Sequence, residues 1–233
     1  TLEIWLSNKV NSVDENIYCE YEDDVFQQNI KEGKSKFTQL KLYGSKNFSF
    51  QSNEVFKAIT NFFSLFVKGE YKFDEIEFVF ETNTAIAGKY GGNDSELLTE
   101  WAGNKGQLEG DLLKRCAAKL KSIVTEFVQE RLPELIKVDK TLAQVAELEF
   151  ANMPEVVWEN FAKSIKWIFN EEYPNDAIEK VNDSIKNLIK SLPFPSSKNQ
   201  SEQAFTALYY EVSEKMFQQD IGERCLTPQR MDE

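Results

Sequence analysis

The first part of the chain has the two-residue period of hydrophobic and polar positions that is typical of β-strands. The period holds over Ile17–Glu22 and again over Phe37–Tyr43, and a second short strand fits Asp24–Gln28 between them. Asn29–Ser35 has the composition of a turn, and residues 2–10 have helical spacing. The pattern therefore predicts a helix followed by a meander of three short strands.

A helical period comes next. Val55, Ile59, Phe62 and Phe66 recur at the spacing that places apolar side chains on one face of a helix. The apolar run Ile76–Glu81 then predicts a further strand. Because a strand–helix–strand crossover joins parallel strands, we expect one parallel pair beside the meander.

From residue 95 onward the pattern is helical. The predicted helices are Ser95–Asn104, Leu108–Arg131, Glu134–Ala151, Glu155–Asn170, Asn175–Ser191 and Ser201–Ile221. We therefore expect an α/β core over residues 1–94 and an all-helical C-terminal extension over residues 95–233. Since residues 2–10 read as the interior of a helix, we expect the N-terminus of the core to be truncated.

Composition narrows the chemistry. The 233 residues include no histidine and three widely separated cysteines. The absence of histidine excludes Ser-His and Cys-His nucleophiles, histidine bases and histidine metal ligands. Cysteines without a disulfide or metal-binding role are typical of a reducing compartment. The sequence contains no apolar run of about 18 residues, so it predicts no membrane-spanning helix. The sequence thus favours a cytoplasmic protein whose catalysis, if any, uses carboxylates, lysines, amides or a bound metal.

The net charge of −12 argues against a general nucleic-acid binder, but the charge is unevenly distributed. Lysines gather between Lys31 and Lys46, where Glu32 is the only acidic residue. Lys34, Lys36 and Lys46 are candidates for contact with phosphates. The alternative is a solubilising hairpin whose lysines bind nothing.

One constellation carries possible chemistry. In a meander, Asp24 on the second strand comes close to Gln39 and Lys41, which the two-residue period places on one face of the third. A carboxylate and an amide carbonyl are oxygen ligands for Mg²⁺, and a lysine stabilises charge on a phosphodiester undergoing attack. The alternative is a solvated strand face with ordinary cross-strand polar pairs.

These residues also carry a resemblance. The segments EYEDDV, FTQLKLYGSKNFSFQSNEVFKAITNFF and IEFVFETN, together spanning about residues 17–83, resemble the PD-(D/E)XK nuclease superfamily in its (D/E/Q)XK form. Within it, the chain looks like the double-stranded-DNA endonuclease domain of bacterial antiphage systems. There the domain is joined to cyclic-nucleotide sensors (CD-NTase-associated systems), STAND NTPases or HerA-like ATPases.

The resemblance implies a restriction-endonuclease-like core and a DNA endonuclease dependent on Mg²⁺ or Mn²⁺. It implies Asp24 as metal ligand, Gln39 as second ligand near the metal and Lys41 as catalytic lysine, with Glu22 assisting. It further implies duplex DNA, an activating sensor or ATPase and further copies of the chain as partners, in the bacterial cytoplasm. A catalytically inactive, nuclease-like assembly module and an RNA-directed nuclease are the alternatives.

Overall fold

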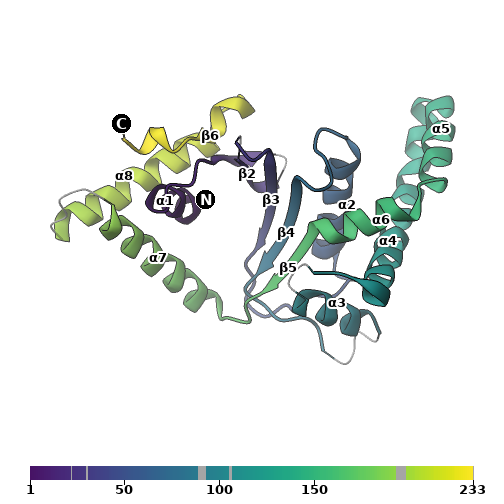
Figure 1. The fold of residues 1–233 in the computed structure, drawn as a ribbon, viewed down its shortest axis with the longest axis horizontal. Coiled ribbons are helices and arrows are strands. Elements are labelled where there is room, and N and C mark those ends of the chain that lie inside the picture. The colour runs from purple at the N-terminus through teal and green to yellow at the C-terminus, as the bar shows by residue number, and fades with distance from the viewer. Residues whose placement is uncertain (22, 30, 89–92, 105–106, 193–197, 233) are drawn as a thin grey trace. The chain divides into compact units, whose positions relative to one another are not determined.

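A computed structural model describes residues 1–233 except 22, 30, 89–92, 105–106, 193–197 and 233 (Figure 1). The described residues form a mixed α/β fold with eight α-helices and a six-stranded sheet. The helices are α1 (Leu2–Val10), α2 (Asn53–Val67), α3 (Asn93–Gly103), α4 (Gly110–Val138), α5 (Lys140–Ala151), α6 (Glu155–Ser164), α7 (Pro174–Ser191) and α8 (Lys198–Met216). The strands are β1 (Asn16–Tyr21), β2 (Asp23–Asn29), β3 (Lys34–Lys41), β4 (Ile76–Thr82), β5 (Ile165–Phe169) and β6 (Cys225–Leu226).

The strand order in the sheet is β5-β4-β3-β2-β1-β6. β1 is antiparallel to β2 and to β6, and β2 is antiparallel to β3. The predicted order of helix, three-strand meander, helix and strand over the first 82 residues is therefore confirmed. The expected parallel pair stays a prediction.

The described chain groups into two compact units. Unit 1 contains residues 1–45, 81–84 and 170–233, and unit 2 contains residues 46–80 and 85–169. Each unit is discontinuous in sequence and includes segments from both sides of residue 94. The expected functional division at that residue stays a prediction.

In unit 1 the meander buries one face against helices. Ile17, Cys19 and Val25 alternate along β1 and β2, and all three are buried in one cluster with Trp5 and Leu6 of α1. α7 and α8 contribute further apolar side chains to this cluster. Because a fully buried large apolar side chain contributes about 1.5–3 kcal/mol, this face anchors the unit.

The opposite face of the meander carries a row of stacked rings. Tyr18 pairs with Phe26 across β1 and β2, and Phe26 pairs with Phe37 across β2 and β3. The ring centroids lie 5.2 Å apart in the first pair and 4.5 Å apart in the second. Such cross-strand aromatic pairs fix the register of a sheet, because a one-residue slip would turn every ring to the other face.

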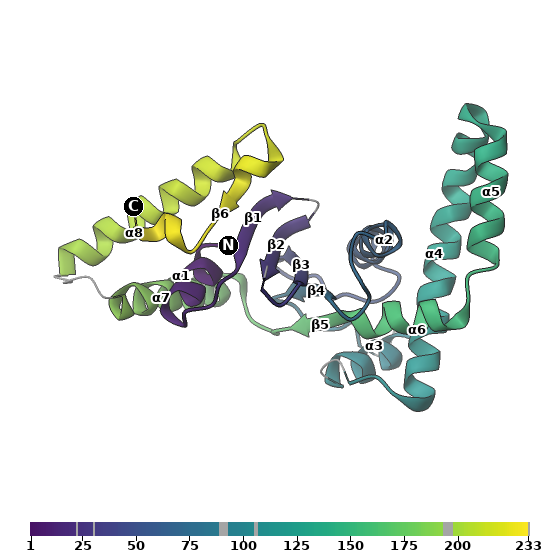
Figure 2. The ribbon, with the colours of Figure 1, turned by 45° about the horizontal axis from the view of Figure 1, so that its top comes forward.

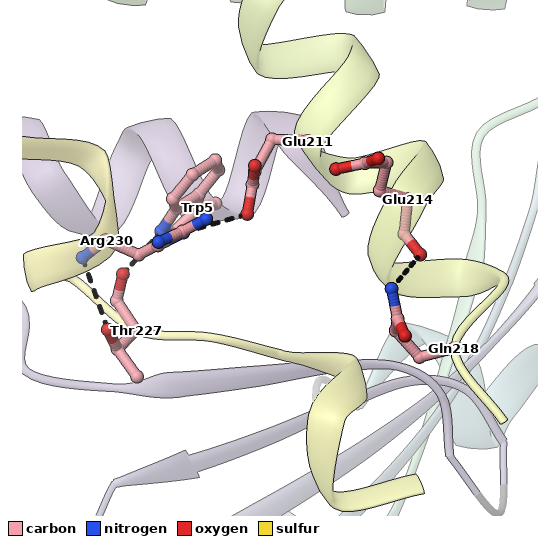
Figure 3. Close-up of polar contacts among 6 residues, drawn as sticks. All are labelled: Trp5, Glu211, Glu214, Gln218, Thr227 and Arg230. Carbon is pink, nitrogen blue, oxygen red and sulfur yellow. Dashed lines mark hydrogen bonds and ion pairs between the residues drawn. The ribbon is translucent and has the colours of Figure 1, made fainter. Parts of the chain in front are cut away.

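The C-terminal segment closes unit 1 by adding β6 to the edge of β1 (Figures 1 and 2). The indole Nε1 of Trp5 donates to the carbonyl oxygen of Thr227 at 2.9 Å, and Arg230 pairs with Glu211 of α8 at 3.0 Å (Figure 3). Leu226 of β6, which directly precedes Thr227, is fully buried. Apolar burial and these polar contacts together hold the segment beside α1 and α8.

Unit 2 has an aromatic core. The rings of Phe63 and Trp158 stack at 5.1 Å, joining α2 to α6. Trp101 of α3 meets Trp167 of β5 edge to face at 5.5 Å. Trp158 and Trp167 are both buried and belong to this core.

Two predictions about the C-terminal part were wrong. Residues 165–169 form β5 instead of the end of a helix, and residues 225–226 form β6, so the extension is not all-helical. The segment Ile165–Phe169 buries Ile165 and Trp167 while Lys166 between them pairs with Glu77 of β4. An apolar run this short fits either a strand or a helix, and its position in the sheet decided between them.

The described helices include none that combines the length and the apolar composition needed to cross a bilayer.

Candidate metal and phosphodiester site

The candidate site lies in unit 1 where β2 and β3 adjoin. Val25 pairs with Thr38, so the same register continued by one residue would place Asp24 opposite Gln39. Lys41 lies two residues further along β3, on the face that Gln39 occupies. The antiparallel meander therefore brings together residues that are 15 and 17 positions apart in the sequence, as predicted.

Asp24 and Lys41 are in direct contact. The Lys41 ammonium nitrogen lies 3.3 Å from the Asp24 carboxylate oxygen Oδ2. The same oxygen accepts a hydrogen bond of 2.7 Å from the backbone N–H of Leu40. The side chains of Asp24 and Lys41 are 33% and 23% exposed, so solvent reaches the pair and screens its charges.

Gln39 supplies an unsatisfied acceptor. Its side-chain oxygen Oε1 is buried, and no donor among the described residues binds it. A buried carbonyl oxygen without a donor is costly, at about 1–3 kcal/mol, and such a position suits a ligand that contributes positive charge. An Asp24 carboxylate and a Gln39 amide oxygen match the oxygen preference of Mg²⁺ or Mn²⁺.

The acidic cluster of β1 and β2 differs from a simple alternating strand face. Glu20 has a left-handed backbone, with φ of 52°, which a residue other than glycine rarely adopts. Its carbonyl oxygen accepts a 2.8 Å hydrogen bond from Arg224. Glu22, expected to assist the metal, lies outside the described residues, and its role stays a prediction. Within the described part of the chain, no three Asp, Glu or Cys side chains are grouped to hold a metal ion.

The three lysines expected to contact DNA have different surroundings. Lys34 is exposed and pairs with Glu32 at 2.8 Å. Lys36 is half-buried on β3, on the face opposite Gln39 and Lys41 because strand side chains alternate. Lys46 belongs to unit 2, where Glu54 binds it through both carboxylate oxygens at 2.6 and 2.7 Å. Their part in DNA binding stays a prediction.

The cysteines take no part in the site. Burial raises the pKa of Cys19 to about 11 and that of Cys116 to about 12, so both remain protonated thiols near neutral pH. Burial also raises the pKa of Cys225, an effect that a hydrogen bond from Tyr18 partly opposes. The expectation of idle thiols accords with these surroundings, since only a thiolate is reactive.

Sequence reasoning missed two features beside the site. The first is the Leu40 backbone N–H, whose bond to Asp24 depends on the local geometry of the strand end and leaves no trace in residue type. The second is Asn83, which follows β4 and is 5% exposed. Its side-chain Oδ1 accepts from the Tyr43 N–H and its Nδ2 donates to the Tyr43 carbonyl oxygen, both at 2.9 Å. Nδ2 also donates to the Glu172 carbonyl oxygen at 3.0 Å.

No protein-family profile matches the chain, and no curated protein is detectably similar in sequence. Among solved structures, the chain is similar to the Acinetobacter baumannii Cap4 SAVED/CARF-domain containing receptor, in complexes with the cyclic trinucleotides 2′3′3′-cAAA and 3′3′3′-cAAA and in a further structure whose title names no ligand.

The three similarities are remote. Sequence identities are 14%, 13% and 15%, and the TM-scores are 0.48, 0.49 and 0.46. They cover 99%, 99% and 93% of this chain but only 41%, 40% and 40% of the matched chains. The chain thus spans about two fifths of the length of these structures, and at these values the comparison assigns no role to any of its residues.

Proposed function

We propose that the chain is a metal-dependent endonuclease domain that cuts double-stranded DNA, and that it serves as the effector of a bacterial antiphage system. The observation that carries the proposal is the convergence of Asp24 and Lys41, 3.3 Å apart, on adjacent strands with the unsatisfied Gln39 oxygen. The sequence resemblance to PD-(D/E)XK nucleases and a restriction-endonuclease-like order of elements point to the same chemistry.

Asp24 and Gln39 would hold the metal through oxygen atoms. The ion, when bound, would polarise the phosphodiester and lower the pKa of a coordinated water. Lys41 contributes a positive charge beside the Asp24 carboxylate, where it can stabilise negative charge that develops on the phosphate. The Leu40 N–H orients the carboxylate, because its 2.7 Å hydrogen bond fixes one oxygen.

Assembly into an oligomer would supply the affinity for DNA that the negative net charge of a single copy opposes. At a net charge of −12, a single copy is repelled by duplex DNA except near local lysines such as Lys34, Lys36 and Lys46. Several copies held by a sensor or ATPase partner would bind DNA at several points at once, which raises the effective affinity. Activity would then depend on oligomerisation and remain low in the monomer.

The test is cleavage of supercoiled plasmid by the purified protein, with Mg²⁺ or Mn²⁺ and with EDTA. Lys41→Ala should reduce cleavage at least about 100-fold, which is typical of losing a group that stabilises the transition state. Lys119→Ala is the matched control, because Lys119 forms an ion pair with Asp94 and is 22% exposed, close to the 23% of Lys41. Cleavage by Lys41→Ala that equals a measurable cleavage by the parent would rule out the assigned site, and preference for a competing RNA would favour an RNA-directed nuclease.

A catalytically inactive assembly module is the second candidate, and a specific observation favours it. Asp24 is already engaged by Leu40 and Lys41, and the described residues contain no three-carboxylate metal site. Calorimetric titration with Mn²⁺ separates the two candidates. Metal binding that Asp24→Asn weakens supports the nuclease, whereas no binding by a protein that still oligomerises supports the module.

A further inference from the structure

Unit 1 contains a groove that lies beside the candidate site and shares Lys41 with it. Its volume is about 530 Å³, within the range of ordinary ligand sites. The walls come from α1, from the ends of β3 and β4, and from the segment that begins at Asn170 and continues into α7. Every lining residue belongs to unit 1. We call it the acidic groove.

The floor of the acidic groove is apolar and open to solvent. Leu40 and Leu42 of the β3 end are 41% and 54% exposed, and Ile178 and Val181 of α7 are 47% and 42% exposed. Scattered exposed apolar residues are ordinary on a surface, but four around one concavity indicate a contact site. A ligand for this floor must bring apolar side chains.

Carboxylates outnumber ammonium groups by three to two in the lining of the acidic groove, where the two lysines are Lys41 and Lys180. Glu3, Glu81 and Glu172 line it, and only Glu172 has an ion pair within the described residues, with Lys180 at 2.6 Å. The hydrogen bond and the charge of Glu172 raise the pKa of Lys180, and the charges of Glu3 and Glu81 add to the shift. The three carboxylates therefore act on one small region. Asn170 donates to the Glu81 carboxylate at 3.2 Å, and neither Glu3 nor Glu81 forms an ion pair within the described residues, so both can pair with a cationic ligand.

The acidic groove is held in shape by internal hydrogen bonds. Asn83 ties the β3 end to the 170–173 segment through its side chain, and the Glu172 N–H donates to the Asn83 carbonyl oxygen at 2.6 Å. The Asn170 N–H donates to the Thr82 carbonyl oxygen at 2.9 Å in the same way. A groove fixed before binding loses little conformational entropy when a ligand enters, which favours affinity.

We propose that the acidic groove is the docking site for a basic amphipathic peptide segment of a partner protein. Its Leu, Ile or Val side chains would contact Leu42 and Val181, and its Lys or Arg side chains would pair with Glu3 and Glu81. Charge complementarity favours this ligand class, because the carboxylates of Glu3 and Glu81 attract cationic side chains. The assignment does not depend on the nuclease chemistry.

Docking here would adjoin the candidate site. Leu40 and Lys41 both line the acidic groove, and the Leu40 backbone N–H and the Lys41 ammonium both contact the Asp24 carboxylate. A segment seated on Leu40 thus contacts the strand end that positions the Asp24 carboxylate. A partner bound in the acidic groove would therefore act on the candidate site through Leu40.

Fluorescence anisotropy of a labelled short peptide that alternates Lys or Arg with Leu or Val tests the proposal in the 233-residue protein. A peptide of equal charge, with Ser in place of Leu and Val, reports attraction to the acidic surface in general. The amphipathic peptide should bind at least about tenfold more tightly than the Ser peptide, because only it buries apolar surface.

Paired variants locate the binding. Glu3→Gln with Glu81→Gln, and separately Val181→Lys, should each weaken binding about tenfold through lost charge pairs or a like charge placed on the apolar floor. The matched controls are Glu147→Gln with Glu149→Gln, and Val145→Lys; all three residues are exposed on α5 of unit 2, and Val145 is 47% exposed against 42% for Val181.

Equal weakening by the α5 controls, or no difference between the two peptides, would overturn the proposal. A groove variant that lowers the sedimentation mass of the protein alone would identify a second copy as the occupant and would also overturn it. Circular dichroism confirms that each variant is folded. Because the readout is peptide affinity, failure here leaves the cleavage test of the nuclease unaffected.

Discussion

Replacing Asn83 by alanine tests how much its hydrogen bonds to Tyr43 and Glu172 contribute to the stability of unit 1. The Asn83 side chain makes three hydrogen bonds: its Oδ1 accepts from the Tyr43 N–H, and its Nδ2 donates to the carbonyl oxygens of Tyr43 and Glu172. These bonds join segments 40 and 89 residues away in the sequence. Water does not easily replace these bonds, since Asn83 is only 5% exposed.

The expected loss is about 3 kcal/mol, taking about 1 kcal/mol for each of three net hydrogen bonds in a buried setting. Against a total stability of about 5–15 kcal/mol, this loss is large. Asn83→Asp should be at least as harmful at pH 7. It keeps the acceptor for the Tyr43 N–H but turns acceptor oxygen toward two carbonyl oxygens and buries a charge without a cation.

The assay is urea denaturation followed by circular dichroism, together with hydrogen exchange of the Tyr43 amide, which should lose protection in Asn83→Ala. Asn152→Ala is the control, because Asn152 is exposed and its single 2.8 Å bond goes to Leu148 in its own helix turn. A loss for Asn83→Ala no larger than that of the control, about 0.5 kcal/mol or less, would refute the hydrogen-bond reasoning.

Three further predictions concern the remaining polar and titratable groups. Lys41→Ala and Lys119→Ala should each cost at most about 1 kcal/mol in urea denaturation, because both ion pairs are partly exposed; a much larger loss for Lys41 would make its effect on cleavage a folding effect. The pKa of Cys19 rises from 9.0 to about 11 on folding, so the folded state binds more protons in this range; stability should fall between about pH 9 and pH 11, and less steeply in Cys19→Ala. Trp5→Phe removes the 2.9 Å bond to the Thr227 carbonyl oxygen and should cost about 1 kcal/mol or more, with faster proteolysis after Thr227; unchanged proteolysis would show that β6 alone holds the segment.

The sequence predicted the local elements of the first 82 residues because their physical causes are local. Alternation located β1, β2 and β3, and the apolar stripe of α2 and the run of β4 located those elements within about three residues of their bounds. The proximity of Asp24 and Lys41 was also predictable, since a meander of adjacent antiparallel strands allows few other arrangements.

The tertiary structure decided what depends on distant partners. β5 is a strand where a helix was predicted, because an apolar segment five residues long takes the conformation that its neighbours in the sheet allow. β6 exists through its pairing with β1 more than 200 residues earlier. No local pattern encodes such pairings, because their hydrogen bonds form only after the intervening chain has folded.

The candidate site also has features that the sequence predicted and features that only the tertiary structure decided. Residue types and spacing determined which side chains could bind a metal and a phosphodiester, since strand geometry fixes which of them share a face. Only the tertiary structure decided that Leu40 binds Asp24, that Gln39 has a buried oxygen without a donor among the described residues, and that Asn83 joins Tyr43 to Glu172 beside the acidic groove. The physical reason is that burial and hydrogen-bond satisfaction belong to the packed chain as a whole, whereas periodicity belongs to each segment alone.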